Sequence, residues 1–346
     1  MGRSAPSTLS AAAAALSRLV VVSGLLLLWS SCCVRAEHSS KRLAIITGGT
    51  RGIGRGICEA LVSSGEYDGF LLTYNTNREA AEAFVEELLA DNGTKNNNDI
   101  QVELIGGDLS TEEVRNEIFE CVDTKFQSYD LATLVHNAGQ YLGVTSSNVD
   151  GITPGVMKFG DGSLLKEDGK IDLTYMEYYQ KLYGIAFIDL CERSLARMKA
   201  AFKKAKESGE SSSYRGSIIG ISSPGCNHHF KITPGYDMPG SGKSLMEFSI
   251  RLYALEAASY GINCNVVIPG FVRTGAWDKV AEQRGLSADK MLGSMVPKAV
   301  PMQEVMDPYH IGDTVRFLAG SGGGKFMTGL SLRVDGGLHL GTKPMR

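Results

Sequence analysis

The chain has 346 residues, of which 43% are hydrophobic and 21% are charged, and its formal net charge is −3. This length allows one large domain or two small ones, with enough apolar residues for a stable core. A slightly negative chain without a basic stripe gives no support for nucleic acid as a partner. The seven cysteines include no CxxC pair and no metal-ligand spacing, so we expect free thiols and no metal site.

Residues 1–36 are predicted to be a targeting leader outside the fold. An apolar run, LVVVSGLLLLW at 19–29, follows Arg3 and Arg18 and precedes a small-residue pattern that ends at Ala36. The run is short for a membrane span and is typical of a signal peptide. We therefore expect the secretory pathway and the endoplasmic reticulum. The alternatives are an uncleaved anchor that associates with a membrane through this segment, and a composite leader for an organelle such as a plastid.

A glycine-rich turn, TGGTRGIG at 47–54, is the most informative stretch of the chain. It follows a short apolar run, LAIIT at 43–47, and opens a segment with apolar residues at helical spacing that Gly65 is placed to end. Glycine in a strand-to-helix turn lets a pyrophosphate approach the backbone closely. The helix N-terminus then supplies free N–H groups and the positive end of a dipole. The turn therefore predicts a dinucleotide site.

The spacing Gly48-x3-Gly52-x-Gly54 resembles the TGxxxGIG motif of the short-chain dehydrogenase/reductase family. The resemblance covers residues 41–341, which we expect to be a single NAD(P)-binding domain. Strands and helices alternate along this region, which predicts a doubly wound α/β fold of Rossmann type, with a parallel sheet flanked by helices. The resemblance implies an NAD(P)-dependent oxidoreductase. Many members of the family are tetramers, so it also implies a homo-oligomer.

The end of the second predicted strand bears on the choice of cofactor. An NAD-dependent enzyme of this type usually has an acidic residue there for the ribose 2′-hydroxyl. Here the strand GFLLTY at 69–74 is followed by Asn75 and then by Arg78, without a carboxylate, and Arg51 lies in the glycine turn. Two cations suit a 2′-phosphate, so we expect NADPH to be preferred over NADH. The alternative is that both arginines are merely solvated.

Further landmarks of the family follow in order. The third strand leads to Asp108 and Leu109, which the resemblance places around the adenine, and the fourth leads to HNAG at 136–139, similar to the family's NNAG. His136 replaces the first Asn of that motif, and we interpret it as structural rather than as a catalytic base. PGFVRT at 269–274 resembles PGxVxT at the nicotinamide end. The cofactor-binding residues implied by the resemblance are Thr47, Gly48, Thr50, Arg51, Gly52, Ile53, Gly54, Asn75, Arg78, Asp108, Leu109, Asn137, Ala138, Gly139, Lys243, Pro269, Gly270, Val272 and Thr274.

Hydride transfer to a carbonyl leaves negative charge on its oxygen, so the site needs an acid whose pKa is lowered towards neutrality. The family uses a Tyr for this purpose, with a Lys four residues later and a Ser before both. The Lys binds the nicotinamide ribose and favours the tyrosinate, and the Ser binds the substrate oxygen. In this chain Ser223 and Lys243 correspond to the Ser and the Lys, whereas Pro239 stands where the Tyr is expected.

Three interpretations of this departure are open. Tyr236 is the nearest phenol, and Tyr236-x6-Lys243 resembles the spacing of enoyl-thioester reductases. Tyr183, which replaces the family's catalytic Asn, is the second candidate for the proton donor. In the third interpretation, the site binds a dinucleotide but catalyses no reaction.

The substrate is defined only as a class. Reduction of a ketone or a 3-oxoacyl group is the family's usual activity, and reduction of an enoyl thioester is the alternative. The stretch at 275–308 is predicted to be a mobile lid, whose Met291, Leu292, Met295 and Val296 either contact a hydrophobic substrate or belong to the core. The glycine-rich stretch at 141–173 is longer than the family's usual connection, and long loops are often functional.

Overall fold

The structure is a computed structural model, and it describes residues 40–90, 100–139, 159–160, 162–209, 215–226, 237–282 and 284–341. The predicted leader at 1–36, Tyr236 and residues 141–158 of the glycine-rich stretch lie outside these residues, so the expectations placed on them stay predictions. Within the part that is described, no helix is both long enough and apolar enough to cross a membrane.

The strands of the described residues form one sheet of seven parallel strands in the order β3-β2-β1-β4-β5-β6-β7. The first connections run outward from β1 to β3, and the chain then returns to β4 on the other side of β1. A topological switch point of this kind is where open α/β sheets bind ligands. The expected doubly wound α/β fold is confirmed. The strands are β1 Lys41–Thr47, β2 Gly69–Tyr74, β3 Gln101–Gly106, β4 Tyr129–His136, β5 Gly216–Ile221, β6 Ile262–Pro269 and β7 Ser331–Val334.

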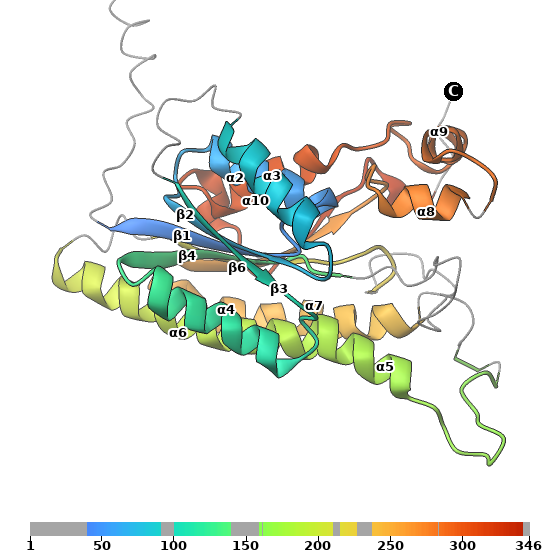
Figure 1. Cartoon of the computed structure of the whole chain (residues 1–346), viewed down its shortest axis with the longest axis horizontal. Helices are drawn as coiled ribbons and strands as arrows, with labels where there is room; N and C mark the ends of the chain where they lie inside the picture. The colour runs from blue at the N-terminus through green and yellow to red at the C-terminus, as the bar shows by residue number, and fades with distance from the viewer. Residues whose placement is uncertain are drawn as a thin grey trace, which may run out of the picture. The chain divides into compact units, whose positions relative to one another are not determined.

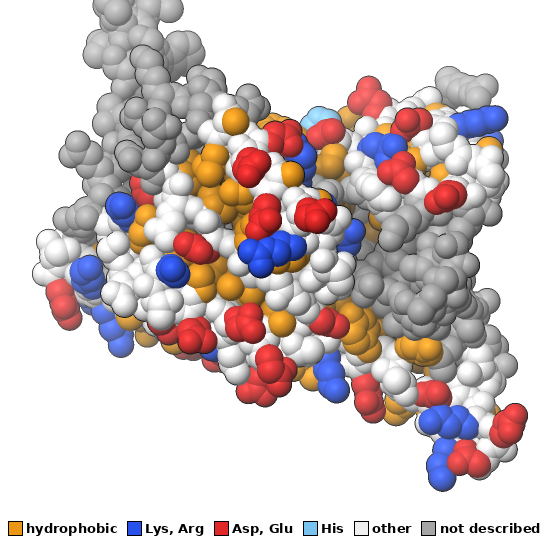
Figure 2. Space-filling model, in the orientation of Figure 1, with side chains coloured by type: hydrophobic (Ala, Val, Ile, Leu, Met, Phe, Trp, Pro, Cys, Tyr) orange, Lys and Arg blue, Asp and Glu red, His pale blue; other side chains and the backbone are white. Residues whose placement is uncertain are grey.

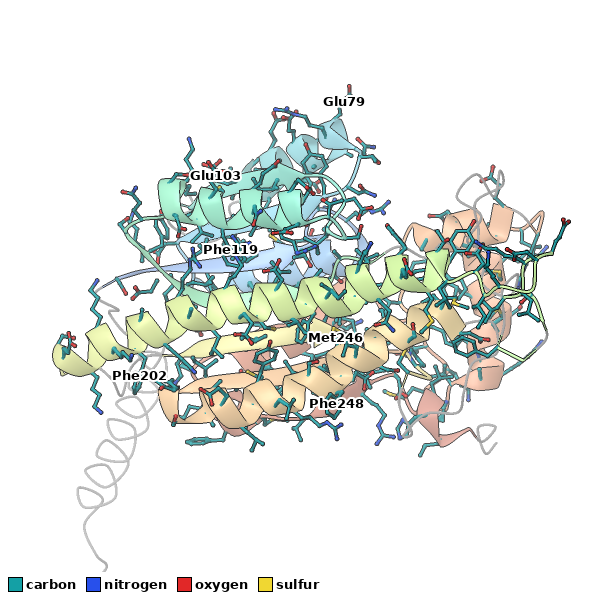
Figure 3. The ribbon with its side chains drawn as sticks, turned by 90° about the horizontal axis from the view of Figure 1, so that it is seen from below. Glu79, Glu103, Phe119, Phe202, Met246 and Phe248 are labelled. Atoms are coloured by element: carbon teal, nitrogen blue, oxygen red, sulfur yellow. The ribbon has the colours of Figure 1, made fainter. Side chains whose placement is uncertain are left out.

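Helices cover both faces of the sheet, with α2, α3 and α10 on one side and α4, α6 and α7 on the other (Figure 1). The helix α5, the π-helical turn η3 and α6 follow one another without a break and form a single long rod (Figure 3). The α-helices are α2 Gly52–Ser63, α3 Arg78–Ala90, α4 Glu112–Lys125, α5 Thr174–Tyr179, α6 Ala186–Glu207, α7 Asp237–Ala257, α8 Ala276–Glu282, α9 Ala288–Ala299 and α10 Pro308–Ala319. The shorter turns are η3 Gln180–Ile185, η4 Ala258–Tyr260, η5 Gly323–Phe326 and η6 Leu338–Leu340.

The sheet separates two hydrophobic cores because successive side chains of a strand point to opposite faces. In β1, Leu43 and Ile45 join the core beneath α4, α6 and α7, whereas Ala44 and Ile46 join the core beneath α2, α3 and α10. Both faces are therefore buried, which explains why the strand reads as a continuous apolar run. On the side shown in Figure 2, acidic and basic side chains are interspersed.

The apolar stripe of α7 faces away from the sheet. Phe248, Leu252 and Leu255 are 55%, 56% and 81% exposed, while Met246 and Ile250 supply the buried face (Figure 3). The helical spacing of these residues in the sequence shows that they share a face, but it does not show whether that face meets the sheet or solvent. An exposed apolar stripe of this kind is a feature of interaction surfaces.

The predicted lid contains two helices, α8 and α9, and its apolar residues are core. Met291, Leu292 and Val296 are buried in small clusters within this segment, and Met295 packs against one of them. The alternative that they are core residues is therefore the better one, and they give no support for a hydrophobic substrate. The free thiols expected at Cys58, Cys191 and Cys264 are present and buried.

Candidate active site

The glycine turn has the geometry that its sequence predicts. Gly48 and Gly52 have φ angles of +62° and +52°, a region that side chains disfavour. A Cβ on Gly54 would lie only 1.9 Å from the carbonyl oxygen of Gly48, so the first turn of α2 packs directly on the end of β1. This cradle leaves no space for a methyl group and brings a helix N-terminus to the carboxyl ends of β1 and β4. The arrangement fits an anionic pyrophosphate.

Thr47 and Asn137 tie the glycine turn to the loop after β4. The Thr47 hydroxyl oxygen accepts hydrogen bonds from the backbone N–H groups of Asn137 at 3.0 Å and Ala138 at 2.9 Å. The Asn137 amide donates in return to the carbonyl oxygens of Thr47 at 3.2 Å and Gly48 at 3.0 Å. The structure thus brings together four of the predicted cofactor-binding residues and fixes them by reciprocal bonds.

His136 is buried at the end of β4, and its Nδ1 atom lies 3.3 Å from the Thr47 hydroxyl. Burial lowers the pKa of His136 to about 3, and the charge of Lys243 acts in the same direction. The ring packs against Phe187 with 5.7 Å between centroids. A neutral imidazole in this position supports the interpretation of His136 as structural.

A surface hollow of about 470 Å³ lies at the ends of β2 and β3. The predicted residues Asn75 and Arg78 line it. Arg78 is already paired, since its Nε lies 2.7 Å from Oε1 of Glu82, which sequence reasoning missed although their i,i+4 spacing was visible. The hollow is lined by Tyr74, Asn75, Thr76, Arg78, Glu82, Leu104, Ile105, Gly106, Gly107 and Glu117.

The loop after β3, which carries Asp108 and Leu109, is held by Arg115, another residue that sequence reasoning missed. The Arg115 Nη1 donates to the carbonyl oxygens of Leu109, Ser110 and Thr111 at 3.0, 3.0 and 2.8 Å, and its Nε donates to Asp189 on α6 at 2.5 Å. Arg115 is 6% exposed, so these bonds are shielded from water. The loop that carries the predicted Leu109 is thereby fixed to the helix layer.

The loop after β6 closes the other end of the cradle. The backbone N–H of Gly270 donates to Val334 at 2.9 Å, and a Cβ on Gly270 would lie 2.8 Å from the Cα of Asp335. Thr274 lies against the glycine turn, since its Cγ2 would be 3.4 Å from a Cβ on Gly52. PGFVRT therefore reaches the glycine turn through Thr274, and its predicted place at the nicotinamide end stays a prediction.

Lys243 and Ser223 meet at the catalytic end. Lys243 lies on α7 and is 8% exposed, and its Nζ donates to the Ser223 hydroxyl at 2.9 Å and to the carbonyl of Ile221 at 3.3 Å. Burial lowers the pKa of Lys243, while Cys226 and Glu247 act in the opposite direction. Ser223 follows directly after β5, so sheet and helix together position this pair.

Of the two tyrosines predicted as candidate proton donors, only Tyr183 lies within the described residues. Tyr183 lies in η3, and its ring centroid is 4.9 Å from the Lys243 Nζ. Tyr236 lies outside the described residues and directly precedes Asp237, where α7 begins. Pro239 is buried in the first turn of that helix and has no proton to donate. The structure therefore brings Tyr183 to the Lys243–Ser223 pair and leaves the assignment of Tyr236 as a prediction.

Glu247 is a buried carboxylate that sequence reasoning did not identify. One of its oxygens accepts a hydrogen bond from the Ser222 hydroxyl, and the other accepts one from Ser331 at 3.2 Å. The residue lies one helical turn after Lys243, so its i,i+4 spacing on α7 was the available signal. It supplies negative charge near the buried ammonium without a direct ion pair between them in the described structure.

Comparison with known proteins agrees with this geometry. A family model described as short chain dehydrogenase matches residues 42–152, and one described as Enoyl-(Acyl carrier protein) reductase matches residues 186–339. The chain belongs to the short-chain dehydrogenase/reductase family. The family predicted from TGxxxGIG is thus confirmed, and with it an oxidoreductase that acts on carbonyl or hydroxyl groups with a nicotinamide dinucleotide.

Curated relatives match this chain over almost their whole length. The chain is 26% identical to the (S)-acetoin-forming diacetyl reductase of Staphylococcus epidermidis, over 86% of this chain and 98% of the relative. It is 27% identical to the 3-oxoacyl-acyl-carrier-protein reductase of Haemophilus influenzae, with the same two coverages.

Solved structures support the fold. The L-sorbose reductase of Gluconobacter frateurii, in complex with NADPH and L-sorbose, superposes with a TM-score of 0.64 at 21% identity and covers 88% of this chain and 98% of that one. The acetoin dehydrogenase of Enterobacter cloacae superposes with a TM-score of 0.65 at 20% identity, over 89% of this chain and all of that one. At these identities the likeness shows the fold alone.

Proposed function

We propose that the chain is an NADPH-dependent reductase of a ketone or 3-oxoacyl carbonyl. The observation that carries the proposal is the buried Lys243 ammonium, which donates to the Ser223 hydroxyl at 2.9 Å beside an intact dinucleotide cradle. The curated relatives reduce carbonyl compounds, which favours this chemistry. The dinucleotide, when bound, supplies the hydride. The chain must bind it, hold the substrate oxygen and deliver a proton.

Each of these tasks has a group in the chain. The cradle of Thr47, Gly54 and Asn137 binds the dinucleotide, and Ser223 donates its hydroxyl proton in a hydrogen bond to the substrate oxygen. Tyr236 donates the proton that the reduced oxygen takes up. Lys243 lowers the pKa of this phenol because a nearby positive charge stabilises the tyrosinate.

The preference for NADPH is part of the proposal. Asn75 follows directly after β2, where an NAD-dependent enzyme usually has an acidic residue. Arg51 is exposed at the N-cap of α2. Arg78 contributes less than the sequence suggested because Glu82 already binds it. Calorimetric titration with NADPH and NADH tests the preference, and equal or tighter binding of NADH contradicts it.

Reduction of an enoyl thioester is the second candidate. It is favoured by the Tyr236-x6-Lys243 spacing and by the description of the family model that matches residues 186–339. The third candidate is a protein that binds the dinucleotide but catalyses no reaction. It is favoured by Pro239, which stands where the family has its catalytic Tyr and has no acidic group.

One assay distinguishes the three functions. The oxidation of NADPH is followed with a diketone, a 3-oxoacyl thioester and a 2-enoyl thioester. We expect turnover with the carbonyl substrates. Turnover with the enoyl thioester alone supports the second candidate, and binding of NADPH without any turnover supports the third.

We also propose a homo-oligomer that forms through α7. The exposed stripe of Phe248, Leu252 and Leu255 presents apolar surface that a second copy of the chain would cover. Light scattering after gel filtration should give a multiple of the chain mass, and Leu255→Lys should reduce it. An unchanged mass for this variant contradicts the assignment of the interface.

We propose the secretory pathway as the destination, from the leader at 1–36. N-terminal sequencing of protein from its native host should find a start near Glu37. An intact Met1 in a membrane fraction indicates an anchor, and import into a plastid indicates a composite leader.

A further inference from the structure

We propose that Tyr183 is a positioning residue that holds the Lys243 ammonium against the face of its ring, and that its hydroxyl is not the proton donor. The inference deepens the proposed function and rests on it, because it concerns the lysine of the same site. It assigns a different role to the residue that sequence analysis left as an alternative acid.

The contact between the two residues is a cation–π interaction. The Lys243 Nζ lies 4.9 Å from the centroid of the Tyr183 ring, inside the range of about 6 Å in which such contacts attract. Two of the three ammonium donors meet oxygen atoms, those of Ser223 and Ile221. The ring thus supplies negative potential to a charge that has lost its water, the situation in which these contacts are strongest.

The ring is held in place from several sides. Tyr179 stacks on it with 5.7 Å between centroids and an interplanar angle of 5°, and Tyr179 is fully buried. A Cβ on Gly242 would lie 3.1 Å from the Tyr183 Cβ, so α7 packs closely on η3. The π-helical turn itself is an uncommon conformation that is frequent at functional sites. The orientation of the ring is therefore fixed by its surroundings.

The hydroxyl of Tyr183 lies toward the loop after β4 and not toward Lys243. A Cβ on Gly139 would lie 3.0 Å from Cε1 and 3.1 Å from the hydroxyl oxygen of Tyr183, so this edge of the ring faces the loop after β4. The face of the ring, rather than its hydroxyl, is what Lys243 meets.

The other titratable groups around the ammonium come from each neighbouring element. They are His136 from β4, which burial keeps neutral, Cys226 from the loop after β5 and Glu247 from α7. Glu247 is bound to Ser222 and Ser331. The ring is thus the group of η3 that acts on the charge of Lys243.

Fluorinated side chains test the ring without a change of shape. Position 183 is replaced by Phe and by 4-fluoro-, 3,5-difluoro- and 3,4,5-trifluorophenylalanine, because each fluorine weakens the negative potential of the ring face. The Tyr183→Phe protein, which keeps the ring, is the reference for the series, and relative to it we expect turnover and NADPH affinity to fall stepwise, to about a tenth in the trifluoro protein. The same series at Tyr175 on α5 is the matched control.

Two results overturn the proposal. Loss of turnover in Tyr183→Phe shows that the hydroxyl is the acid, and a flat response to fluorination shows that the ring face does not act on Lys243. Thermal unfolding of each protein confirms that it is folded.

A second readout needs no activity. The pH titration of the ¹³Cε signal of Lys243, assigned by its loss in Lys243→Arg, reports the charge of the amine in the free protein. The titration midpoint should move to lower pH with each added fluorine, since the charged form loses stabilisation. An unchanged midpoint contradicts the proposal. If the midpoint moves but the wild type reduces no substrate, the proposed function fails while the positioning role of Tyr183 stands.

Discussion

The two ends of the candidate site are built from different parts of the chain. At the dinucleotide end the predicted cradle is formed mainly by backbone. It consists of a turn with no space for a Cβ, a helix N-terminus and hydrogen bonds between Thr47 and Asn137. The catalytic end is formed instead by a few side chains, among which Lys243 contacts Ser223 and Tyr183. A change at the first end meets steric limits at once. At the second end, side chains rather than backbone carry the departures from the family pattern, namely Pro239 in place of the Tyr and Tyr183 in place of the Asn.

Tyr236→Phe is the strongest test of the catalytic end. The variant keeps the ring and removes only the hydroxyl, so we expect turnover to fall by about 10²–10⁴-fold, the usual effect of losing a general acid. Calorimetry should show NADPH binding nearly unchanged. Tyr260→Phe, at a phenol in η4, is the control. Full turnover in Tyr236→Phe contradicts the assignment and moves the acid to another group.

Gly54→Ala is the corresponding test of the dinucleotide end. Its methyl group would lie 1.9 Å from the carbonyl oxygen of Gly48, which is backbone and must move. We expect NADPH affinity to fall by about 100-fold, since overpacking of this kind costs about 3 kcal/mol. Gly293→Ala is the matched control because a Cβ there meets nothing within 4 Å. If both variants bind NADPH as the wild type does, the turn is not the phosphate cradle.

Arg51→Ala separates the two cofactors. The loss of a charged hydrogen bond to the 2′-phosphate should weaken NADPH by about 1.5–3 kcal/mol and leave NADH unaffected. Arg78→Ala should have a smaller effect, because Glu82 already holds that guanidinium. Calorimetry on both variants measures the difference. Equal losses for NADPH and NADH in Arg51→Ala show that Arg51 does not recognise the 2′-phosphate.

His136→Asn tests the junction between the two ends through pH. The pKa of His136 is about 3 in the folded chain and near 6.5 ordinarily, so the unfolded chain binds the extra proton between these values. The stabilisation is present above pH 6.5 and is lost as pH falls. From pH 7 to pH 5, urea unfolding should show the wild type losing about 2 kcal/mol more than His136→Asn. Equal losses contradict a buried neutral imidazole.

The parts of the molecule that the sequence predicted are those that backbone sterics determine. The glycine turn and the alternation of strands and helices in a doubly wound parallel sheet follow from residue types with narrow conformational choices. The Arg78–Glu82 pair has the i,i+4 spacing of neighbours on a helix, so the sequence carried a signal for it. Arg115 could not be found, since its three carbonyl partners come together only once α4 packs below the loop.

The catalytic end was predicted only in part. Ser223 and Lys243 were identified from their position relative to β5 and α7. The approach of Tyr183 to Lys243 depends on the π-helical turn η3, which shifts the facing side chains and has no signature in the sequence. The exposed side of α7 was likewise undetermined, because periodicity shows that a stripe exists and not which neighbour covers it.

The most direct test of the proposed function follows the hydride itself. The chain is given NADPH deuterated at the transferable position of C4, with a 3-oxoacyl thioester and a 2-enoyl thioester in parallel, and the products are examined by mass spectrometry and NMR. We predict deuterium on the carbinol carbon of a 3-hydroxyacyl product, and a much smaller yield of this product with Lys243→Met. Deuterium on the β-carbon of a saturated thioester, or no transfer to either substrate while NADPH binds, would contradict a carbonyl reductase.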